Sequence, residues 1–437
     1  MSLSPSFAGR RGTRGGLLVL TIVAVVLVGC GPEEAPTPVR SGAEVLAGTN
    51  FDRLSGRRVG LIANHTTRVD TSHLADRLAA APNVELGTIF APEHGFRGTA
   101  GAGEAVEDER DPRTGAPVYS LYGDTRRPTP EMLEGLDALV FDVQDVGARF
   151  YTYITTMGLS MQAAAEADLT FVVLDRPNPL GGTYTDGFVL EPDHASFVGR
   201  YPIPVAHGLT IGEIARYIQA EQLLPGIEAL DLSVVPMENW TRGMQWPDTG
   251  RTWRPPSPNL PTWETALLYP GMCFFEGVRV SEGRGTERPF RRIGAPWSPE
   301  AAREVVDTLR ARGLSGIAVD TTAFTPRPMS GAPAPRFEGE QVYGFEIQVT
   351  DRRAVEPVKV GIHALHAMYQ QAQARGDTAF VSRPEHLTRL AGTDRLLTQL
   401  RNGASPGAIV AAWSDAVEAF RDRRGPALLY EGERAEQ

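Results

Sequence analysis

Residues 89–98 read IFAPEHGFRG, and this stretch decides the fold class of the chain. Residues 84–90 have the apolar character of a buried strand, and Pro92 ends that strand. Glu93, His94 and Arg97 follow on a short loop that contains two glycines. In open α/β sheets, ligands bind outside the carboxyl ends of the strands, where such a loop lies. The stretch therefore predicts a parallel sheet with a functional site at its edge.

Three further apolar runs, at residues 59–63, 138–141 and 171–174, end in the same way. Asn64 and His65 follow the first run, Asp142, Gln144 and Asp145 the second, and Asp175, Arg176 and Asn178 the third. Helices predicted at residues 72–80 and 153–167 and from Thr129 onward alternate with these runs. This alternation predicts an α/β fold whose mostly parallel sheet is covered by helices on both faces. Four polar clusters on one edge of that sheet indicate an active site.

The N-terminus has the pattern of an export signal. Arg10, Arg11 and Arg14 precede an apolar stretch at residues 17–28 that is too short for a confident membrane span. Residues 27–30 read LVGC and resemble a bacterial lipobox, in which Cys30 would carry the lipid. We therefore expect a signal peptide at residues 1–29, a flexible tether at 30–43 and a membrane-anchored, periplasm-facing or extracytoplasmic lipoprotein. The residue that follows Cys30 is Gly31 and not the aspartate of a retention signal, so the sequence is compatible with an outer-membrane location.

The composition changes at residues 255–261, PPSPNLP, which we take as a domain junction. We expect an α/β domain at residues 44–258 and a smaller α+β domain at 259–437. Residues 98–127 read as a long irregular loop, and Thr210 begins a capping-box pattern at the start of a helix. In the second domain, strands are expected at 316–320 and 342–350, and helices at 298–313, 358–373 and 405–421.

Several chemistries are disfavoured by the sequence. The net charge of −10 gives no basis for nucleic-acid binding. No G-x-G-x-x-G follows a strand, and no G-x-S-x-G nucleophile motif or H-E-x-x-H zinc motif is present. We therefore expect no cofactor and no metal. A metal hydrolase that uses Asp142, Asp145, His94 and His207 stays an open alternative.

The remaining polar residues suit acid–base cleavage of a polar, partly anionic substrate. Glu93 is the expected general acid, because Phe90 and Phe96 border its loop and a partly dehydrated setting favours a protonated carboxyl group. The alternative is that Glu93 caps a helix or pairs with Arg97. The second catalytic carboxylate is expected among Asp142, Asp145 and Glu282, and His94 is a further catalytic candidate.

Substrate-binding residues are expected on the same loops. Arg149, Arg176 and Arg284 are candidate anion clamps, because a guanidinium group binds a carboxylate through two hydrogen bonds. Tyr151, Tyr153, Trp253 and Trp263 are candidate stacking surfaces for a sugar ring. The full set of expected binding residues comprises Asn64, His65, Gln144, Asp145, Arg149, Tyr151, Asp175, Arg176, Asn178, His207, Asn259, Glu282 and Arg284.

The ordered motifs of the chain resemble those of a known family. They are residues 64–66 (NHT), 92–95 (PEHG), 119–123 (YSLYG), 141–153 (FDVQDVGARFYTY), 174–179 (LDRPNP), 207–213 (HGLTIGE), 256–261 (PSPNLP), 276–277 (EG) and 281–286 (SEGRGT). The chain is similar to the NamZ-type exo-β-N-acetylmuramidases over nearly all of its length after residue 45.

The resemblance implies a Rossmann-like domain used without a dinucleotide, a smaller C-terminal domain and an active-site cleft between them. It further implies release of N-acetylmuramic acid from the non-reducing end of peptidoglycan fragments such as MurNAc-GlcNAc, in cell-wall turnover, with Glu93 as the catalytic residue.

Two questions stay open at the level of sequence. Two carboxyl groups roughly 5–5.5 Å apart would imply retention of configuration and roughly 6.5–9.5 Å inversion, and participation by the acetamido group of the substrate is a third route. A non-catalytic lipoprotein that captures muropeptides or cell-wall sugars is the main rival function. A third candidate function is an esterase or deacetylase of cell-wall sugars. The sequence has neither the nucleophile motif nor the set of metal ligands that such an enzyme needs.

Overall fold

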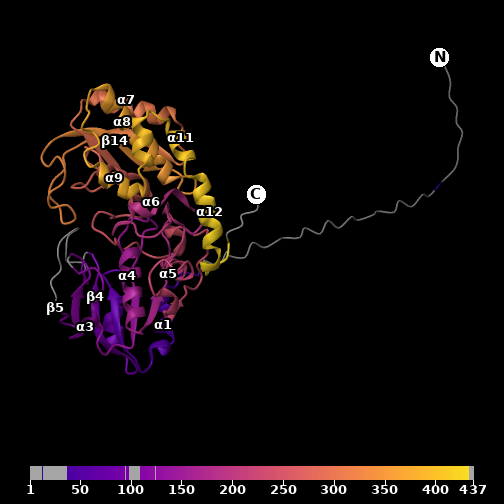
Figure 1. Cartoon of the computed structure of the whole chain (residues 1–437). Helices are drawn as coiled ribbons and strands as arrows, with labels where there is room; N and C mark the ends of the chain where they lie inside the picture. Colours follow the sequence, from indigo (N-terminus) through magenta and orange to yellow (C-terminus); the bar gives the residue numbers. More distant parts are fainter. Residues whose placement is uncertain (1–11, 13–36, 94, 98–108, 124, 433–437) are drawn as a thin grey trace, which may run out of the picture. The chain divides into compact units, whose positions relative to one another are not determined.

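The large sheet of the computed structural model has seven strands (Figure 1). Their order across the sheet is β11 (Leu232–Val235), β8 (Thr170–Leu174), β7 (Ala138–Asp142), β1 (Arg58–Ala63), β4 (Glu85–Ala91), β6 (Pro117–Ser120) and β5 (Glu109–Arg110). Six of the strands are parallel, and only β5 runs antiparallel to its neighbour. The predicted α/β class and the four predicted strands that lead to polar loops are confirmed.

The structure describes residue 12 and residues 37–93, 95–97, 109–123 and 125–432. Apart from residue 12, the predicted signal peptide lies outside these residues, as do the lipidation site Cys30 and the catalytic candidate His94. Residues Thr37–Gln437 form one compact unit. The predicted tether extends to residue 43, but Val39, Ser41 and Ala43 are buried. The part of that segment after residue 36 therefore belongs to the folded unit.

Both faces of the sheet are buried, because alternate residues of each strand enter different cores. In β1, Leu61 and Ala63 pack with α1 (Gly42–Gly48) and α2 (Leu74–Ala79), whereas Ile62 faces the core that contains α4 (Tyr153–Glu166) and α5 (Ile211–Ala220). This double coverage explains why the strands are apolar throughout. The capping box predicted at Thr210 is present, with both reciprocal hydrogen bonds to Glu213.

The C-terminal part of the chain is built on an antiparallel sheet of three strands, β12 (Arg292–Ala295), β14 (Val342–Val349) and β13 (Ile317–Phe324). Helix α7 (Pro299–Ala311) packs on it, α8 (Pro357–Ala374) packs against α7, and α6 (Trp263–Met272) crosses α8 (Figure 1). The crossing is so close that a Cβ atom on Gly271 would lie 1.9 Å from the Pro357 carbonyl oxygen. Glycine is therefore required at this position.

The remaining described elements are short. They are β2 (Arg68–Val69), β3 (Ser72–His73), α3 (Pro130–Leu133), β9 (Asp186–Val189), β10 (Pro204–Ala206), α9 (Pro384–Ala391), α10 (Arg395–Arg401), α11 (Pro406–Ala411) and α12 (Ser414–Arg424), with several 3₁₀ turns. Helix α12 packs against β9, so the end of the chain returns to its N-terminal half.

Two local predictions were wrong. Residues 98–127 are not irregular throughout, because β6 extends the sheet beside β4 and β5 pairs with β6. The helix predicted at 405–421 is two helices, α11 and α12, which are separated near Trp413. The indole of Trp413 is buried and donates a hydrogen bond to Asp186, so the break brings this side chain to β9. Within the described part of the chain, no helix is both long and apolar enough to cross a membrane.

Candidate active site

The loop after β4 is anchored on both sides of Glu93. Gly95 has a φ of +74°, and its N–H donates to the Pro92 carbonyl, which closes the turn. The ring of Phe96 packs edge-on against His73 with centroids 4.6 Å apart. Arg97 pairs with Asp111 and Asp76. The alternative that Arg97 pairs with Glu93 is therefore wrong.

The Glu93 side chain is half-buried among hydroxyl groups. The hydroxyl of Thr152 donates to Glu93 Oε2 at 2.9 Å. The phenol of Tyr122 faces the same carboxylate, and burial together with this negative charge raises the pKa of Tyr122 to about 12. Both neighbours are neutral hydrogen-bond donors at neutral pH. The carboxyl group is thus oriented by hydroxyl donors, and no cation is paired with it among the residues that the structure describes.

Tyr153 joins this loop to the neighbouring strand. Its hydroxyl lies 3.2 Å from the Glu93 carbonyl oxygen and 3.1 Å from that of Pro256, and it accepts a hydrogen bond from Asn64 Nδ2 at 3.0 Å. Burial raises the pKa of Tyr153 well above its usual range, and the nearby Glu93 charge adds to this shift. Tyr153 therefore stays neutral, and its one O–H donates a hydrogen bond to one of the two carbonyl oxygens.

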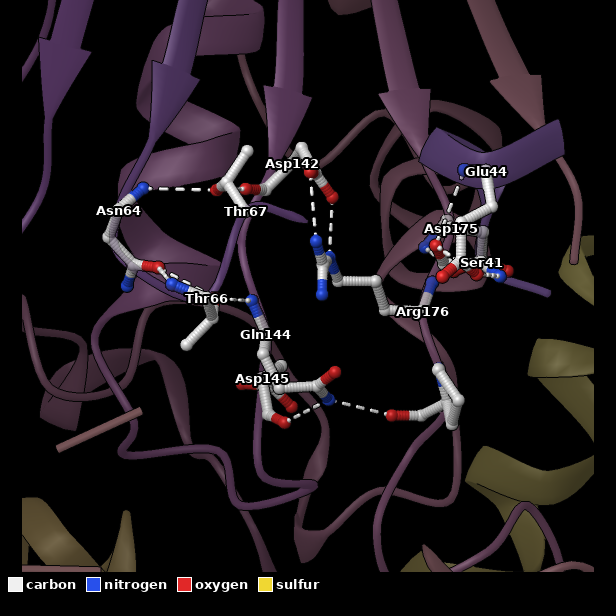
Figure 2. Close-up of polar contacts among 12 residues, drawn as sticks. Ser41, Glu44, Asn64, Thr66, Thr67, Asp142, Gln144, Asp145, Asp175 and Arg176 are labelled. Atoms are coloured by element: carbon white, nitrogen blue, oxygen red, sulfur yellow. Dashed lines mark hydrogen bonds and ion pairs between the residues drawn. The ribbon is translucent and has the colours of Figure 1, made fainter. Parts of the chain in front are cut away.

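A hydrogen-bond network joins the ends of β1 and β7 (Figure 2). Asn64 Oδ1 accepts from the hydroxyl of Thr66 at 2.6 Å, and Thr66 Oγ1 accepts from the Gln144 backbone N–H at 3.3 Å. The hydroxyl of Thr67 donates to the Asp142 carbonyl. The two loops are therefore held in register by side chains where the strands end.

Asp142 is engaged in an ion pair (Figure 2). Arg176 donates from Nε and Nη2 to the two carboxylate oxygens, at 2.5 and 2.8 Å, and the Asp142 side chain is fully buried. Burial raises the pKa of Asp142, and the guanidinium group opposes that shift. With both oxygens taken by Arg176, Asp142 has the contacts of a structural residue rather than of a catalytic base.

Asp145 has a freer carboxylate than Asp142. One oxygen accepts from the Gly147 N–H at 2.7 Å and lies 3.5 Å from Nε2 of the buried His207. The other oxygen has no hydrogen-bond partner among the described residues, and neither has Gln144 Oε1. The negative charges of Asp145 and Glu93 both act on Tyr153. Asp145 is thus the sequence-predicted carboxylate that the structure places in the same electrostatic environment as Glu93.

An aromatic chain connects this region to the C-terminal half. Tyr151 packs edge-on against Tyr153 and Tyr269, with centroids 4.8 and 6.1 Å apart. Tyr269 lies on α6 and packs against Phe290, and the guanidinium of Arg284 lies 5.1 Å from the Phe290 ring centroid. Residues from both halves of the chain therefore surround Tyr151.

Arg284 belongs to a partly buried charge cluster. It pairs with Glu276 at 2.5 Å and Glu282 at 3.1 Å, and His386 lies 3.1 Å from Glu276. Burial alone would raise the pKa of Glu276, but Arg284 and His386 outweigh burial and hold it at about 2. Burial raises the pKa of Glu282, whose Oε2 has no partner within the described ranges. Arg284 is therefore already occupied by two carboxylates.

Other predicted binding residues make structural contacts. Arg149 is buried, and its two Nη atoms donate to the carbonyls of Phe188, Ile203 and Leu390. Asn178 forms hydrogen bonds with the backbone of Leu180 and Leu209, and Asn259 donates to the Gly331 carbonyl.

Asp175 and His65 are also bonded to the protein. Asp175 accepts hydrogen bonds from Arg176 N, Gly212 N and the hydroxyls of Thr210 and Tyr430. His65 Nε2 lies 2.7 Å from the Pro255 carbonyl oxygen. These contacts shape the loops around the site.

Over the described ranges, the ligand-type side chains close enough for a metal are those of Glu191, His194 and Asp394. The metal alternative from the sequence includes His94, which lies outside the described residues. The sequence alone assigned no role to Tyr122, Thr152 or Glu276. All three lie within the motifs, at 119–123, 141–153 and 276–277, so the motifs carried a signal for them.

Comparison with known proteins shows the family of the chain. Two family models match: the N-terminal part of exo-beta-N-acetylmuramidase NamZ over residues 59–264 and its C-terminal part over 267–430. The chain is 42% identical over 397 residues to peptidoglycan beta-N-acetylmuramidase NamZ of Bacillus subtilis (strain 168), which covers 90% of this chain and 91% of that protein.

Two solved structures are also similar. Both are DUF1343 family proteins from Bacteroides fragilis NCTC 9343, with 35% and 34% identity and TM-scores of 0.82 and 0.73, and each match covers 90% of this chain and 99% of the other. With family models that span both halves and a relative of this identity, the chain belongs to the NamZ exo-β-N-acetylmuramidase family and is a glycosidase.

Proposed function

We propose that this glycosidase releases N-acetylmuramic acid from the non-reducing end of peptidoglycan fragments, with Glu93 as general acid. The observation that carries the assignment is the Glu93 carboxyl group, half-buried at the carboxyl end of β4 and oriented by the hydroxyl of Thr152. The printed name of the Bacillus subtilis relative supports the substrate class. A role in cell-wall turnover follows from that substrate.

In the proposed reaction, Glu93 transfers its proton to the glycosidic oxygen as the bond to the anomeric carbon breaks. The hydrogen bond from the Thr152 hydroxyl to Glu93 Oε2 orients the carboxyl group for this transfer. Water adds to the anomeric carbon and loses a proton to a second group. Asp145 is the proposed second carboxylate, since Asp142 is paired with Arg176 through both oxygens. Participation by the acetamido group of the substrate is the alternative to Asp145.

The activity test uses a chromogenic β-N-acetylmuramide beside the matching β-N-acetylglucosaminide. We expect cleavage of the muramide alone, and a loss of about 10²–10⁴-fold in kcat for Glu93→Gln, which is the usual contribution of a general acid. Glu385→Gln, which removes an exposed carboxylate elsewhere, is the matched control and should keep full activity. Full activity in a folded Glu93→Gln variant would refute the assignment. Tight sugar binding without turnover in the wild type would indicate the capture lipoprotein instead.

The stereochemical course separates the two proposals for the second group. NMR of the first product formed gives its anomeric configuration. Inversion with loss of activity in Asp145→Asn would support a base that activates water. Retention, with substrates that lack the acetamido carbonyl failing to react, would support participation by the substrate.

We also propose that the chain is an exported lipoprotein anchored through Cys30, on the basis of the charged segment, the apolar stretch and the LVGC sequence. Partition of the whole chain into a detergent phase tests the anchor. The wild type should enter that phase, and Cys30→Ser should remain in the aqueous phase or keep an uncleaved signal. Equal partition of both forms, with the signal cleaved from each, would exclude a lipid on Cys30.

A further inference from the structure

A cavity of about 550 Å³ lies at the carboxyl ends of β1, β7 and β8. Thr66, Gln144 and Arg176 line it from the sheet, and residues 38–48 and 246–254 contribute its other walls. Glu93 is not among the lining residues. The chain passes from β6 at one side of the sheet to β7 beside β1, so β1 and β7 flank the point where the strand order reverses. Open α/β sheets bind ligands at such a point.

The charge of the cavity lining is strongly positive. Its arginines are Arg40, Arg68, Arg77, Arg176, Arg251 and Arg254, against two carboxylates, Glu44 and Asp70. Three arginines are neutralised locally: Arg251 pairs with Glu44, Arg176 with Asp142 and Arg40 with Glu238. Arg68, Arg77 and Arg254 have no ion-pair partner among the residues that the structure describes. The lining thus holds an excess of cationic donors.

Two residues of the lining carry hydrogen-bond donors that have no acceptor among the described residues. Nε of Arg68 and Nε1 of Trp246 are buried and have no acceptor in the described part of the chain. Both residues line the cavity. Among the described residues, the half-buried Arg68 donates a hydrogen bond to the Thr71 carbonyl and has no carboxylate partner. Its guanidinium group is therefore only partly used by acceptors of the protein.

We propose that this cavity binds a small molecule through a carboxylate or phosphate group. Guanidinium groups bind both anions through paired hydrogen bonds, and the volume is that of a typical small-molecule site rather than of a single ion. The site is separate from Glu93 but joined to it. Thr66 on the cavity wall bonds Asn64, Asn64 bonds Tyr153, and Tyr153 bonds the Glu93 backbone.

The anion has two possible sources. It is either a carboxylate of the substrate itself, such as the lactyl group of N-acetylmuramate, or a separate small anion. The first source rests on the proposed function, and the second does not. Arg149, Arg176 and Arg284, which the sequence predicted as anion clamps, are all engaged by protein groups. In either case the anion is therefore expected to bind other residues.

Isothermal titration calorimetry on the purified full chain separates these sources. The probes are inorganic phosphate, N-acetylmuramic acid and, as the uncharged match, N-acetylglucosamine. The test variant is Arg68→Gln with Arg254→Gln. The control variant is Arg375→Gln with Arg401→Gln, which removes two exposed arginines outside the cavity and matches the charge change. Thermal melting confirms that both double variants are folded.

We expect at least one anionic probe to bind the wild type and the control equally, and the test variant at least about tenfold more weakly. Phosphate binding alone identifies a separate anion and needs no turnover, so it stands even if the proposed muramidase reaction fails. Binding of N-acetylmuramic acid but not of N-acetylglucosamine or phosphate identifies the substrate's own carboxylate. Absence of binding by either anion, or equal weakening in both double variants, would overturn the proposal.

Discussion

Thr152 Oγ1 lies 2.9 Å from Oε2 of Glu93, so the residue that precedes α4 orients the carboxyl group that follows β4. The contact joins two loops at one edge of the sheet. It fixes which oxygen of Glu93 accepts a hydrogen bond, and it constrains the direction in which the other oxygen points. This pair therefore links the fold to the proposed chemistry.

Removal of the Thr152 hydroxyl should slow catalysis with little effect on folding. Thr152→Val keeps the branched shape but removes the donor, and we expect kcat to fall by about 10–100-fold, the equivalent of one hydrogen bond to a charged group. Thr152→Ser keeps the donor and should retain most of the activity. Steady-state kinetics with the chromogenic muramide measure both. Equal activity of the valine and serine variants would show that the hydroxyl does not position Glu93.

Asp142→Asn should act on stability more than on chemistry. The substitution leaves the buried Arg176 guanidinium without its carboxylate, which costs about 3–5 kcal/mol of unfolding free energy. Urea denaturation measures this loss. Arg176→Gln in the same chain should recover part of it, because the double variant buries no unpaired charge. If Asp142→Asn melts like the wild type but is inactive, Asp142 is catalytic and our reading of the ion pair is wrong.

The sequence predicted the sheet better than the site, and for a physical reason. Apolar strands buried on both faces read as continuous runs, so β1, β4, β7 and β8 were recognisable, and a polar residue after each run marked the correct edge. Strand β6 was missed because only four residues form it within a polar segment. Its pairing with β4 is a tertiary effect that local sequence does not show.

Side-chain partners were the harder part. An arginine in a motif suits an anion clamp and a structural ion pair equally well, and only the fold reveals the three carbonyls that receive Arg149 or the carboxylate that receives Arg176. For the same reason, Glu276 was not expected as a partner of Arg284. Glu93 could be named as a candidate from the sequence because its loop follows a strand directly and has an apolar border.

His73 should make stability depend on pH. Its Nε2–H donates to the Asn64 carbonyl and its Nδ1 accepts from the Ala75 N–H, so the neutral ring is required. Burial lowers the pKa of His73 to about 4 from its usual 6.5. Between these values the unfolded chain binds a proton that the native chain does not. The contribution is complete above pH 6.5 and is lost as the pH falls towards 4, by up to about 3 kcal/mol.

His73→Asn tests this dependence, because asparagine still offers an N-cap acceptor for α2. Burial also lowers the pKa values of His65, His363 and His366, so the difference between the wild type and the variant is the relevant quantity. We expect the melting temperature of the wild type to fall more steeply between pH 6.5 and 4.5 than that of His73→Asn. Parallel curves would show that His73 does not titrate as proposed.

The C-terminal segment that contains Tyr430 should contribute to the stability of the fold. Tyr430 donates to the buried Asp175 at 2.5 Å, accepts from the Met237 N–H at 2.8 Å and packs edge-on against Trp240. Tyr430→Phe keeps the ring but leaves Met237 N–H without its acceptor and Asp175 with one donor fewer. We expect a loss of about 1–3 kcal/mol in unfolding free energy and a nearly unchanged kcat, because Asp175 contacts the loop after β8 without contacting Glu93. Tyr369→Phe, which removes a phenol from the C-terminal half, is the matched control and should melt like the wild type. A Tyr430→Phe variant with normal stability but low activity would place Asp175 in the substrate site instead.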